Sequence, residues 1–322
     1  MNLESIITLL GGGWQRVKEL ISSDLRSDVR LLQSINDSLV SNSGKMLRPM
    51  ISLLVANAIG SPEEDSYRFA AASEMLHNAT LMHDDVADSS QERRGRPTVS
   101  ALLGPSGAVL VGDFWLARAV EMVLCSEHYD KVVRLFSKTL TDLAEGEMFQ
   151  MEKARSADTT EEDYFRIIKC KTASLFEAAG GSAAYSVGAS AEMVQAAKDY
   201  SVAFGTAFQI KDDILDYAGT DVLGKPVGVD LKEQKITLPL LGAMKASGDE
   251  QRWRGMVRGI SSRPENADEL RSLVMEHGGI AYASAVLDSY VDKAVSALAV
   301  FPDSPYREAL EALAHFNAFR QK

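Results

Sequence analysis

Two segments of the chain carry three aspartates at the same spacing. Residues 84–88 read Asp-Asp-Val-Ala-Asp and residues 212–216 read Asp-Asp-Ile-Leu-Asp, so the pattern DDxxD occurs twice. Carboxylates at positions i and i+4 of a helix face the same way, and three of them within two turns repel one another unless cations lie between them. Oxygen ligands with few histidines nearby are typical of Mg²⁺, which completes its octahedron with waters and substrate phosphates. The two patterns therefore predict two magnesium-binding helix faces.

Each acidic segment also has a simpler interpretation. A single DDxxD in a chain with 45 acidic residues can be a solvated helix face. Two copies flanked by apolar residues favour metal binding, because acids at the C-terminal end of a helix oppose its dipole and do not stabilise it. Zinc is not expected, since His77 and His83 lack the i, i+4 ligand spacing. We expect His83 to pack against its neighbours or to support another group.

Cations stand where the helical pattern breaks, close to both acidic segments. They occur in Gly44-Lys45-Met46-Leu47-Arg48-Pro49, in Arg93-Arg94-Gly95, in Lys171-Thr172, in Gly224-Lys225-Pro226 and at Lys235. In a chain of formal charge −11, cations beside acidic clusters indicate bound anions. Arginine forks match phosphate oxygens, and lysine supplies a point charge. Any one of these groups taken alone could instead form a surface ion pair.

Counting charges connects the acidic and basic groups. Six aspartates would balance three Mg²⁺ ions, and a diphosphate of about −3 would then be balanced by three cations. We assign these roles to Arg93, Lys171 and Lys225. Lys45, Arg48 and Arg94 remain, which is enough for a second diphosphate without metal. Two diphosphates, one metal-bound and one not, imply a reaction between them.

The rest of the chain predicts the helices that position these groups. Of its 322 residues 46% are apolar, and 120 consecutive residues between Pro105 and Pro226 contain no proline. Apolar residues recur every three or four positions, and no alternating run indicates a strand. A helix should begin at Ser61-Pro62, with the serine as its cap, and run to about Ser89. We expect breaks at residues 11–13, 42–44, 104–107, 180–181, 219–226 and 261–264. We therefore predict one all-α domain over residues 1–322.

Composition excludes several classes of protein. The acidic balance disfavours binding to nucleic acid and adhesion to anionic lipid. No uncharged apolar run reaches about 18 residues and the N-terminus lacks a basic segment, so we expect neither a spanning helix nor a secretory signal. Cys125 and Cys170 are too few for a disulfide scaffold, and we expect both to pack in the core of a cytoplasmic protein.

The motifs together resemble those of the trans-prenyltransferases, the all-trans isoprenyl diphosphate synthases. Five of them follow in order between residues 44 and 241: GKMLRP, HDDVAD with RRG, KTASLF, FQIKDDILDY and GKPVGVDLKEQKITLP. The resemblance implies an all-α bundle of long, mostly antiparallel helices around a deep central cavity, in a homodimer. It also implies a reaction of ionisation, condensation and elimination between an allylic diphosphate and isopentenyl diphosphate, with no protein nucleophile.

The resemblance assigns roles to single residues. Asp84, Asp88 and Asp212 would be direct Mg²⁺ ligands. Asp85, Asp213 and Asp216 would support the metals, Asp216 as a further candidate ligand. The allylic diphosphate would be held by Arg93, Lys171, Gln209, Lys225 and Lys235. Isopentenyl diphosphate would be held by Lys45, Arg48, His77 and Arg94, with Gly44 allowing close approach of the backbone. Thr172 would lie near the forming bond.

Product length should depend on the residues beneath the first acidic cluster. Leu76, Ala79 and Thr80 form a stripe beside the Asp84 face, and Ala79 lies about 7.5 Å along the axis from Asp84. Relatives with short products carry a bulky aromatic residue there. The stripe also stays small at Ala72, so we expect an open tunnel, with a floor formed by residues 112–124, Met122 among them. The product should exceed twenty carbons, as in the synthases of quinone side chains, and should leave through transient membrane contact.

Alternatives remain at this point. The small residues could simply allow close helix packing, with a geranylgeranyl or farnesyl diphosphate as product. A class I terpene cyclase would carry a different second metal motif. A non-catalytic subunit of a heteromeric synthase would lose acidic motifs, and this chain keeps both.

Overall fold

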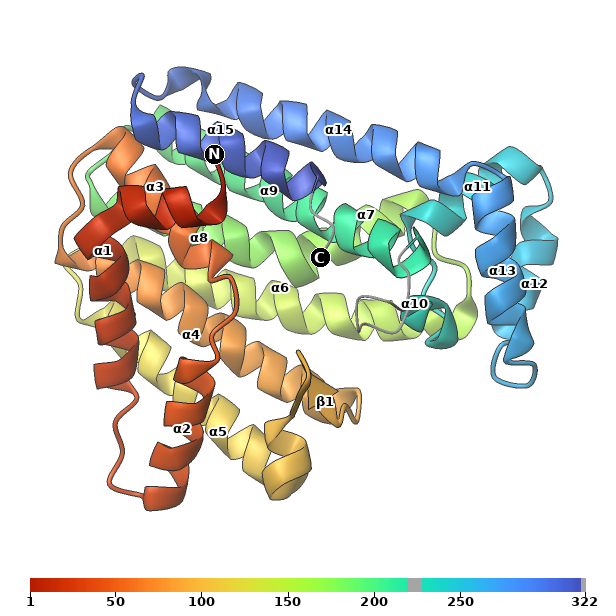
Figure 1. Cartoon of the computed structure of the whole chain (residues 1–322), viewed down its shortest axis with the longest axis horizontal. Helices are drawn as coiled ribbons and strands as arrows, with labels where there is room; N and C mark the ends of the chain where they lie inside the picture. The colour runs from red at the N-terminus through yellow and green to blue at the C-terminus, as the bar shows by residue number, and fades with distance from the viewer. Residues whose placement is uncertain (219–227, 320–322) are drawn as a thin grey trace. The chain divides into compact units, whose positions relative to one another are not determined.

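The computed structural model describes residues 1–218 and 228–319, and almost all of them are helical (Figure 1). The first helices are α1 (Leu3–Asp24), α2 (Arg30–Ser41), α3 (Leu47–Ile59), α4 (Glu64–Ala87), α5 (Val99–Leu124), α6 (Tyr129–Ser156) and α7 (Glu161–Ile168). A π-helical turn, η1 (Lys169–Ala173), leads into α8 (Ser174–Ser186) and α9 (Ala191–Ala218). Beyond residue 228 lie α10 (Val229–Lys232), α11 (Leu238–Ser247), α12 (Glu250–Arg258), α13 (Glu265–Glu276), α14 (Gly279–Ala297), the 3₁₀ turn η3 (Leu298–Val300) and α15 (Pro305–Phe319).

The prediction of an all-α chain is confirmed. Within the described residues, extended structure is limited to a hairpin of β1 (Glu92–Arg93) and β2 (Arg96–Pro97), paired antiparallel with Arg93 opposite Arg96. The hairpin follows α4 directly (Figure 1). It is too short to give an alternating sequence pattern, which is why the sequence does not indicate it.

Contacts divide the chain into two compact units, each built from three segments. The first unit comprises residues 1–137, 175–198 and 300–310, and the second comprises residues 138–174, 199–299 and 311–322. The first DDxxD lies in the first unit and the second DDxxD lies in the second. The single domain over residues 1–322 stays a prediction.

The first unit is organised around α4, which packs along α5 and also touches α3 and α1 (Figure 1). Residues 69–76 of α4 are all buried. In α3, ten of the thirteen residues are buried as well. A helix that is apolar on every side is stable only inside a core. Each fully buried Leu, Ile or Met stabilises the fold by roughly 1.5–3 kcal/mol. The core thus fixes the helix whose C-terminal end carries the first acidic cluster.

Two expected features of the helix boundaries need correction. α4 begins at Glu64, and its N-cap residue is Glu63, whose backbone N–H donates to Ser66 Oγ at 3.2 Å. Ser61 is therefore not the cap of this helix. The break expected at residues 180–181 is absent, because α8 continues through both glycines. A Cβ at Gly181 would lie 3.0 Å from Lys198 and 3.1 Å from Leu135, so this glycine allows close packing and does not end the helix.

Other breaks are confirmed. Gly11 and Gly104 adopt positive φ of 50° and 77° inside α1 and α5, where they kink the helices. A positive φ costs little for glycine, which has no Cβ. Residues 42–44 and 261–264 separate α2 from α3 and α12 from α13. The break expected at residues 219–226 lies outside the described residues.

The second unit holds the pocket described below between α7, η1, α9 and the segment that leads into α11. α11 packs on α14 and α13, and α14 comes so close that a Cβ at Gly279 would lie 2.9 Å from Val274 and 3.1 Å from Ala243. Arg271 on α13 donates from Nε to the carbonyl of Tyr217 at 2.7 Å, near the end of α9. The acidic end of α9 is therefore fixed from the C-terminal part of the chain.

One helix passes a length and composition test for a membrane span, and the expectation about the two cysteines needs correction. α5 is long and apolar enough to cross a membrane by length and composition, and 28% of its apolar window is buried; a core helix of a soluble protein passes the same test. No such helix was expected, because Asp113 and Arg118 interrupt the uncharged run. Cys125 is exposed at the C-terminal cap of α5 and Cys170 is partly buried, so the expectation of two core cysteines is wrong.

Candidate active site

The first acidic cluster ends α4. Asp84 and Asp85 lie in its last turn, and Asp88 is the C-cap residue. The β1 hairpin turns the chain back, so that Arg93 Nε donates to Asp85 Oδ1 at 2.8 Å. Asp85 is 5% exposed, whereas Asp84 and Asp88 are more accessible. The cluster thus consists of one buried carboxylate, Asp85, which binds Arg93, and two carboxylates, Asp84 and Asp88, that are more accessible to solvent.

The cations assigned to isopentenyl diphosphate converge near the start of α3. A Cβ at Gly44 would lie 2.6 Å from Cζ of Arg94, so only glycine leaves room for this guanidinium. Arg48 is 9% exposed, and its guanidinium stacks 4.4 Å from the centre of the Phe176 ring. A close approach was expected at Gly44, and in the structure the group that approaches this glycine is the guanidinium of Arg94. Lys45 is exposed at the entry to α3.

A buried carboxylate that sequence analysis missed stands beside these cations. Glu74 on α4 is 4% exposed, one turn before His77. Burial raises its pKa, while the positive charges of Arg48 and Arg94 act in the opposite direction. The pKa of Arg48 is lowered to about 10, chiefly by burial and also by the charge of Arg94, while Glu74 acts in the opposite direction. The signal for Glu74 was a charge in an otherwise apolar stretch of α4.

His77 belongs to the same cluster. Burial lowers the pKa of this imidazole well below its ordinary value, and Arg48, Arg94 and Arg93 lower it further. His77 is therefore neutral at physiological pH, and it can offer an uncharged hydrogen bond to a diphosphate held by the arginines.

The residues assigned to chain length lie along α4. Leu76 is fully buried and Ala79 is 1% exposed, while Thr80 is partly exposed and its hydroxyl donates to the carbonyl of His77 at 2.9 Å. α5 approaches here, since a Cβ at Gly112 would lie 2.7 Å from Cδ2 of His83. Gly112, the first residue of the segment proposed as the tunnel floor, thus lies against His83, and Met122 of the same segment is 6% exposed.

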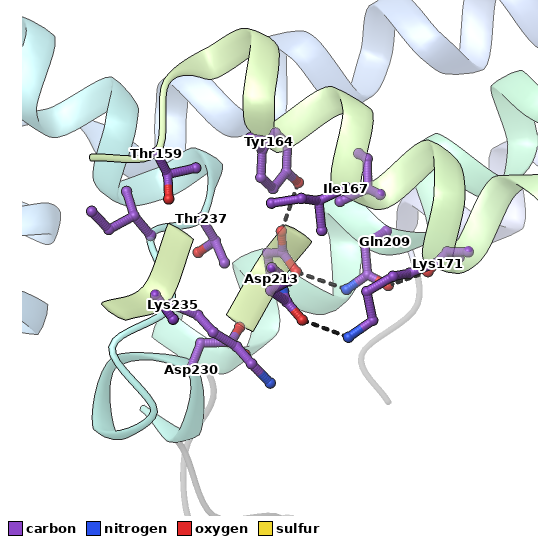
Figure 2. Close-up of a pocket in the computed structure, with 14 residues that line it drawn as sticks. Thr159, Tyr164, Ile167, Lys171, Gln209, Asp213, Asp230, Lys235 and Thr237 are labelled. Atoms are coloured by element: carbon purple, nitrogen blue, oxygen red, sulfur yellow. Dashed lines mark hydrogen bonds between the residues drawn. The ribbon is translucent and has the colours of Figure 1, made fainter. Parts of the chain in front are cut away.

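The second unit contains a cavity of about 110 Å³. It is lined by two acids, two lysines and several hydroxyl and amide side chains, which Figure 2 shows with their neighbours. Five of the residues named from the sequence line it: Lys171, Thr172, Gln209, Asp213 and Lys235. Lys225 lies outside the described residues.

One hydrogen-bonded chain runs through the wall of this cavity (Figure 2). Tyr164 on α7 donates from its phenol to Asp213 Oδ2 at 2.6 Å, and Gln209 Nε2 donates to Asp213 Oδ1 at 2.9 Å. Thr172 Oγ1 donates to Gln209 Oε1 at 2.8 Å, which fixes the orientation of the amide. Both oxygens of Asp213 therefore have a donor. Tyr164 was missed by sequence analysis.

The second acid of the cavity, Asp230, was missed by sequence analysis. The pKa of Asp230 is raised to about 7, chiefly by burial and also by the charge of Asp216, while Lys235 acts in the opposite direction. Burial likewise raises the pKa of Asp213 well above its ordinary value, and Asp230 adds to this effect. The sequence signal that could have identified Asp230 was its place inside the GKPVGVDLKEQKITLP segment. Perturbed carboxyl groups in a cavity are typical of functional sites.

Asp216 holds the chain that follows α9. Its two oxygens accept from the backbone N–H groups of Val229 at 3.1 Å and Asp230 at 3.2 Å, at the start of α10. Burial raises the pKa of Asp216, and these two hydrogen bonds lower it. Asp212, in contrast, is a partly exposed neighbour of the buried Asp213.

Lys171 lies on the π-helical turn η1, a geometry often found at functional sites. Its Nζ donates to Gln150 Oε1 at 2.5 Å and forms an ion pair with Glu147, both on α6. Lys235 is paired with Glu233 at 2.5 Å. The cations at this cavity are thus already matched with acceptors of the chain itself.

The donors of both clusters are hard oxygens, which fit Mg²⁺. No three metal-binding side chains converge on one point in the part of the chain that the structure describes. Asp85, Asp213 and Asp216 are also occupied by donors of the protein. Asp84, Asp88 and Asp212 are more accessible to solvent than Asp85 and Asp213, and they are suited to hold ions whose coordination is completed by phosphate oxygens and water.

An all-α chain with two acidic helix ends, each beside cations suited to diphosphate, defines a diphosphate-handling helical enzyme. Residues 29–276 match the family described as polyprenyl synthetase. The chain belongs to this family and is a trans-prenyltransferase. It is 41% identical to octaprenyl diphosphate synthase of Escherichia coli (strain K12), with 100% of both chains covered.

Two solved structures agree with the fold. A polyprenyl synthase from Caulobacter crescentus CB15, complexed with calcium and isoprenyl diphosphate, has a TM-score of 0.91 and 36% identity, covering 100% of this chain and 98% of the other. A decaprenyl diphosphate synthase from Rhodobacter capsulatus has a TM-score of 0.92 and 33% identity over 100% of both chains. The isoprenoid synthase fold is therefore confirmed.

Proposed function

We propose that this enzyme condenses isopentenyl diphosphate head-to-tail with an allylic diphosphate and makes an all-trans polyprenyl diphosphate of more than twenty carbons. The product length rests on the long-chain synthases among the relatives, and we propose that the small, buried Ala79, five residues before Asp84 on α4, leaves room for the growing chain. The octaprenyl and decaprenyl diphosphate synthases among its relatives support the same range.

The two clusters supply complementary functions. When bound, Mg²⁺ neutralises the allylic diphosphate and makes it a better leaving group. In the first unit, Asp84 and Asp88 would hold ions and Arg93 would bind diphosphate. In the second unit, Asp212 would hold an ion, and Lys171 and Gln209 would bind diphosphate. Asp213 would keep Gln209 and the wall of the cavity in place through its two hydrogen bonds. We propose three ions per active site, as the count of aspartates suggests.

The second diphosphate would bind without metal in the first unit. Lys45, Arg48 and Arg94 supply positive charge, and His77 adds a neutral hydrogen bond. Arg48 is a buried guanidinium with a fixed orientation, so its charge acts in a medium that screens it weakly. This arrangement would position the double bond of isopentenyl diphosphate for attack on the allylic cation.

The protein needs no nucleophile of its own. Its apolar walls would keep water from a carbocation that water would destroy, and the departing diphosphate would accept the proton released in the last step. Thr172, whose hydroxyl is bonded to Gln209, would stay close to the forming bond.

We further propose a homodimer in the cytoplasm. Large apolar side chains on α5 are solvent-exposed in the single chain: Leu102 at 59%, Leu110 at 69% and Leu124 at 50%. A second copy covering this face would remove them from water. A polyprenyl product of this length would leave by brief contact with a membrane, while the acidic chain itself has little attraction for anionic lipid.

Incubation with radiolabelled isopentenyl diphosphate, a short allylic primer and Mg²⁺, followed by sizing of the products, tests the function. We expect all-trans products beyond twenty carbons and none in excess chelator. Products of fifteen or twenty carbons would refute the long-chain proposal but keep the reaction. A purified protein without turnover would refute the reaction itself.

The metal assignment has its own test. Asp84→Ala and Asp212→Ala should each abolish turnover at saturating Mg²⁺, with an unchanged helical circular-dichroism spectrum. Asp28→Ala removes an exposed carboxylate of the same unit as Asp84 and serves as the charge control. Retained turnover in the Asp84 or Asp212 variant would mean that the metal-binding side chains lie elsewhere.

A further inference from the structure

The described cations assigned to the allylic diphosphate share one property: each forms an ion pair with a carboxylate of the chain itself. The pairs are Arg93 with Asp85, Lys171 with Glu147, and Lys235 with Glu233. Asp85 and Glu233 lie in the motifs that suggested the site, whereas Glu147 lies in none of them. The function derived so far gives Glu147 no role.

The fold brings Glu147 to Lys171 by a close approach of α6 to η1. A Cβ at Gly146 would lie 2.6 Å from Cβ of Cys170 and 3.2 Å from Cγ of Lys171. Only glycine at position 146 allows the lysine stem to lie against α6. The ammonium then lies between Glu147 and Gln150, which are three positions apart and so share one face of the helix.

This pair is neither fully exposed nor sealed from solvent. The side chains of Lys171 and Glu147 are 24% and 26% exposed, and Lys171 also lines the cavity. An ammonium has three donors, of which two are used by Glu147 and Gln150. A diphosphate that binds Lys171 therefore meets a cation whose charge is already neutralised by Glu147.

We propose that Glu147 is a positioning residue that competes with diphosphate for Lys171 and thereby weakens the hold of the site on pyrophosphate. The inference rests on the proposed function of Lys171. Each condensation leaves one pyrophosphate at this site, and a long product requires it to leave many times. Glu147 offers the ammonium an alternative partner each time pyrophosphate departs.

The direction in which pyrophosphate inhibition changes in a Glu147 variant distinguishes competition for Lys171 from a purely structural role of Glu147. Replacing Glu147 with glutamine keeps the shape and a hydrogen-bond acceptor but removes the competing charge. An ion pair of this exposure is worth up to about 1 kcal/mol, so Glu147→Gln should tighten inhibition by Mg²⁺-pyrophosphate roughly three- to fivefold. The Michaelis constant for the allylic primer should fall in parallel.

The experiment measures competitive inhibition by inorganic pyrophosphate against the allylic primer in wild type, Glu147→Gln and Glu145→Gln. Glu145 lies on the same helix, is exposed and has the same charge, so its variant controls for net charge. It should leave the inhibition constant unchanged. In a Lys171→Met background, Glu147→Gln should have no further effect, because its partner is gone.

Two results would overturn the inference. Unchanged inhibition in Glu147→Gln would show that the carboxylate does not compete. Weaker pyrophosphate binding with a higher primer Michaelis constant would show that Glu147 orients Lys171 toward the ligand. In both cases wild-type turnover persists, whereas a wild-type protein without turnover would refute the proposed function.

Discussion

The phenol of Tyr164 donates a 2.6 Å hydrogen bond to Asp213 across 49 positions of sequence. The two side chains are 2% and 3% exposed, so neither oxygen can exchange this partner for bulk water. Gln209 occupies the other oxygen of Asp213 and is itself held by Thr172. The buried aspartate thus links α7, η1 and α9 at the wall of the cavity.

Replacing Tyr164 with phenylalanine should remove this link while keeping the ring. A buried carboxylate oxygen would lose its donor, which costs roughly 1–3 kcal/mol of unfolding free energy. Gln209 and Thr172 would lose their fixed orientation, so kcat/KM for the allylic primer should fall about tenfold, with little change in the Michaelis constant for isopentenyl diphosphate. Steady-state kinetics with each substrate varied, together with urea unfolding, measures both effects.

Tyr282→Phe is the matched control for Tyr164→Phe. Tyr282 in the same unit also donates to a carboxylate, Glu161, at 2.8 Å, but it does not line the cavity. Its loss should change stability without changing the kinetics. Equal kinetic defects in both variants would show that the Tyr164 effect is only a loss of stability.

Gly44→Ala should act on the other diphosphate. The added methyl group would collide with the guanidinium of Arg94, which is the flexible end of a side chain and can shift. Stability should therefore change little, while the Michaelis constant for isopentenyl diphosphate should rise about five- to tenfold as Arg94 moves away. Gly12→Ala, where a Cβ meets nothing within 4 Å, is the control. A selective rise in the primer constant instead would mean that Arg94 serves the allylic diphosphate.

Sequence analysis identified the acidic and basic motifs because their members are neighbours in the chain. Helical periodicity and the repeated DDxxD made the fold class and the carboxylates of both clusters predictable. Residues such as Tyr164, Glu74 and Glu147 were missed, since their partners come from elements brought together only by folding. A tyrosine 49 positions from its aspartate has no spacing signal.

The glycines also show which structural features cannot be predicted from the sequence alone. At positions 180–181 two glycines predict a break, yet α8 continues because Gly181 packs closely against Lys198. At position 11 a glycine does kink its helix. Conformational freedom is visible in the sequence, but whether it is used for a turn or for close packing depends on the neighbouring helices.

The stability of the fold at low pH should depend on Asp65, near the start of α4. Burial raises its pKa, but hydrogen bonds from Ser126 at 2.7 Å, His128 at 3.4 Å and the backbone of Glu127 at 3.0 Å outweigh this and lower it. A carboxyl group whose pKa is depressed by folding contributes stability above its ordinary pKa, and that stability is lost as the pH falls through the lower, folded value.

Chemical unfolding of wild type and Asp65→Asn between pH 3 and 7 tests this sign. We expect wild type to be more stable by about 1 kcal/mol above pH 5, and the difference to shrink below about pH 4 as Asp65 takes up a proton. Asp28→Asn, at an exposed position, should show no such convergence. A difference that grows toward low pH would refute the assignment.

The product-length proposal depends on Ala79. In Ala79→Phe a ring would block the tunnel proposed beneath Asp84, so products should shorten to roughly fifteen to twenty carbons, while the rate of the first condensation should change much less. Because Ala79 is 1% exposed, overpacking can also destabilise the fold, and thermal unfolding must accompany product sizing. Ala79→Ser, which adds one small atom, should keep the wild-type length. An unchanged distribution in a folded Ala79→Phe enzyme would show that the growing chain does not pass this residue, and the small stripe of α4 would then serve helix packing.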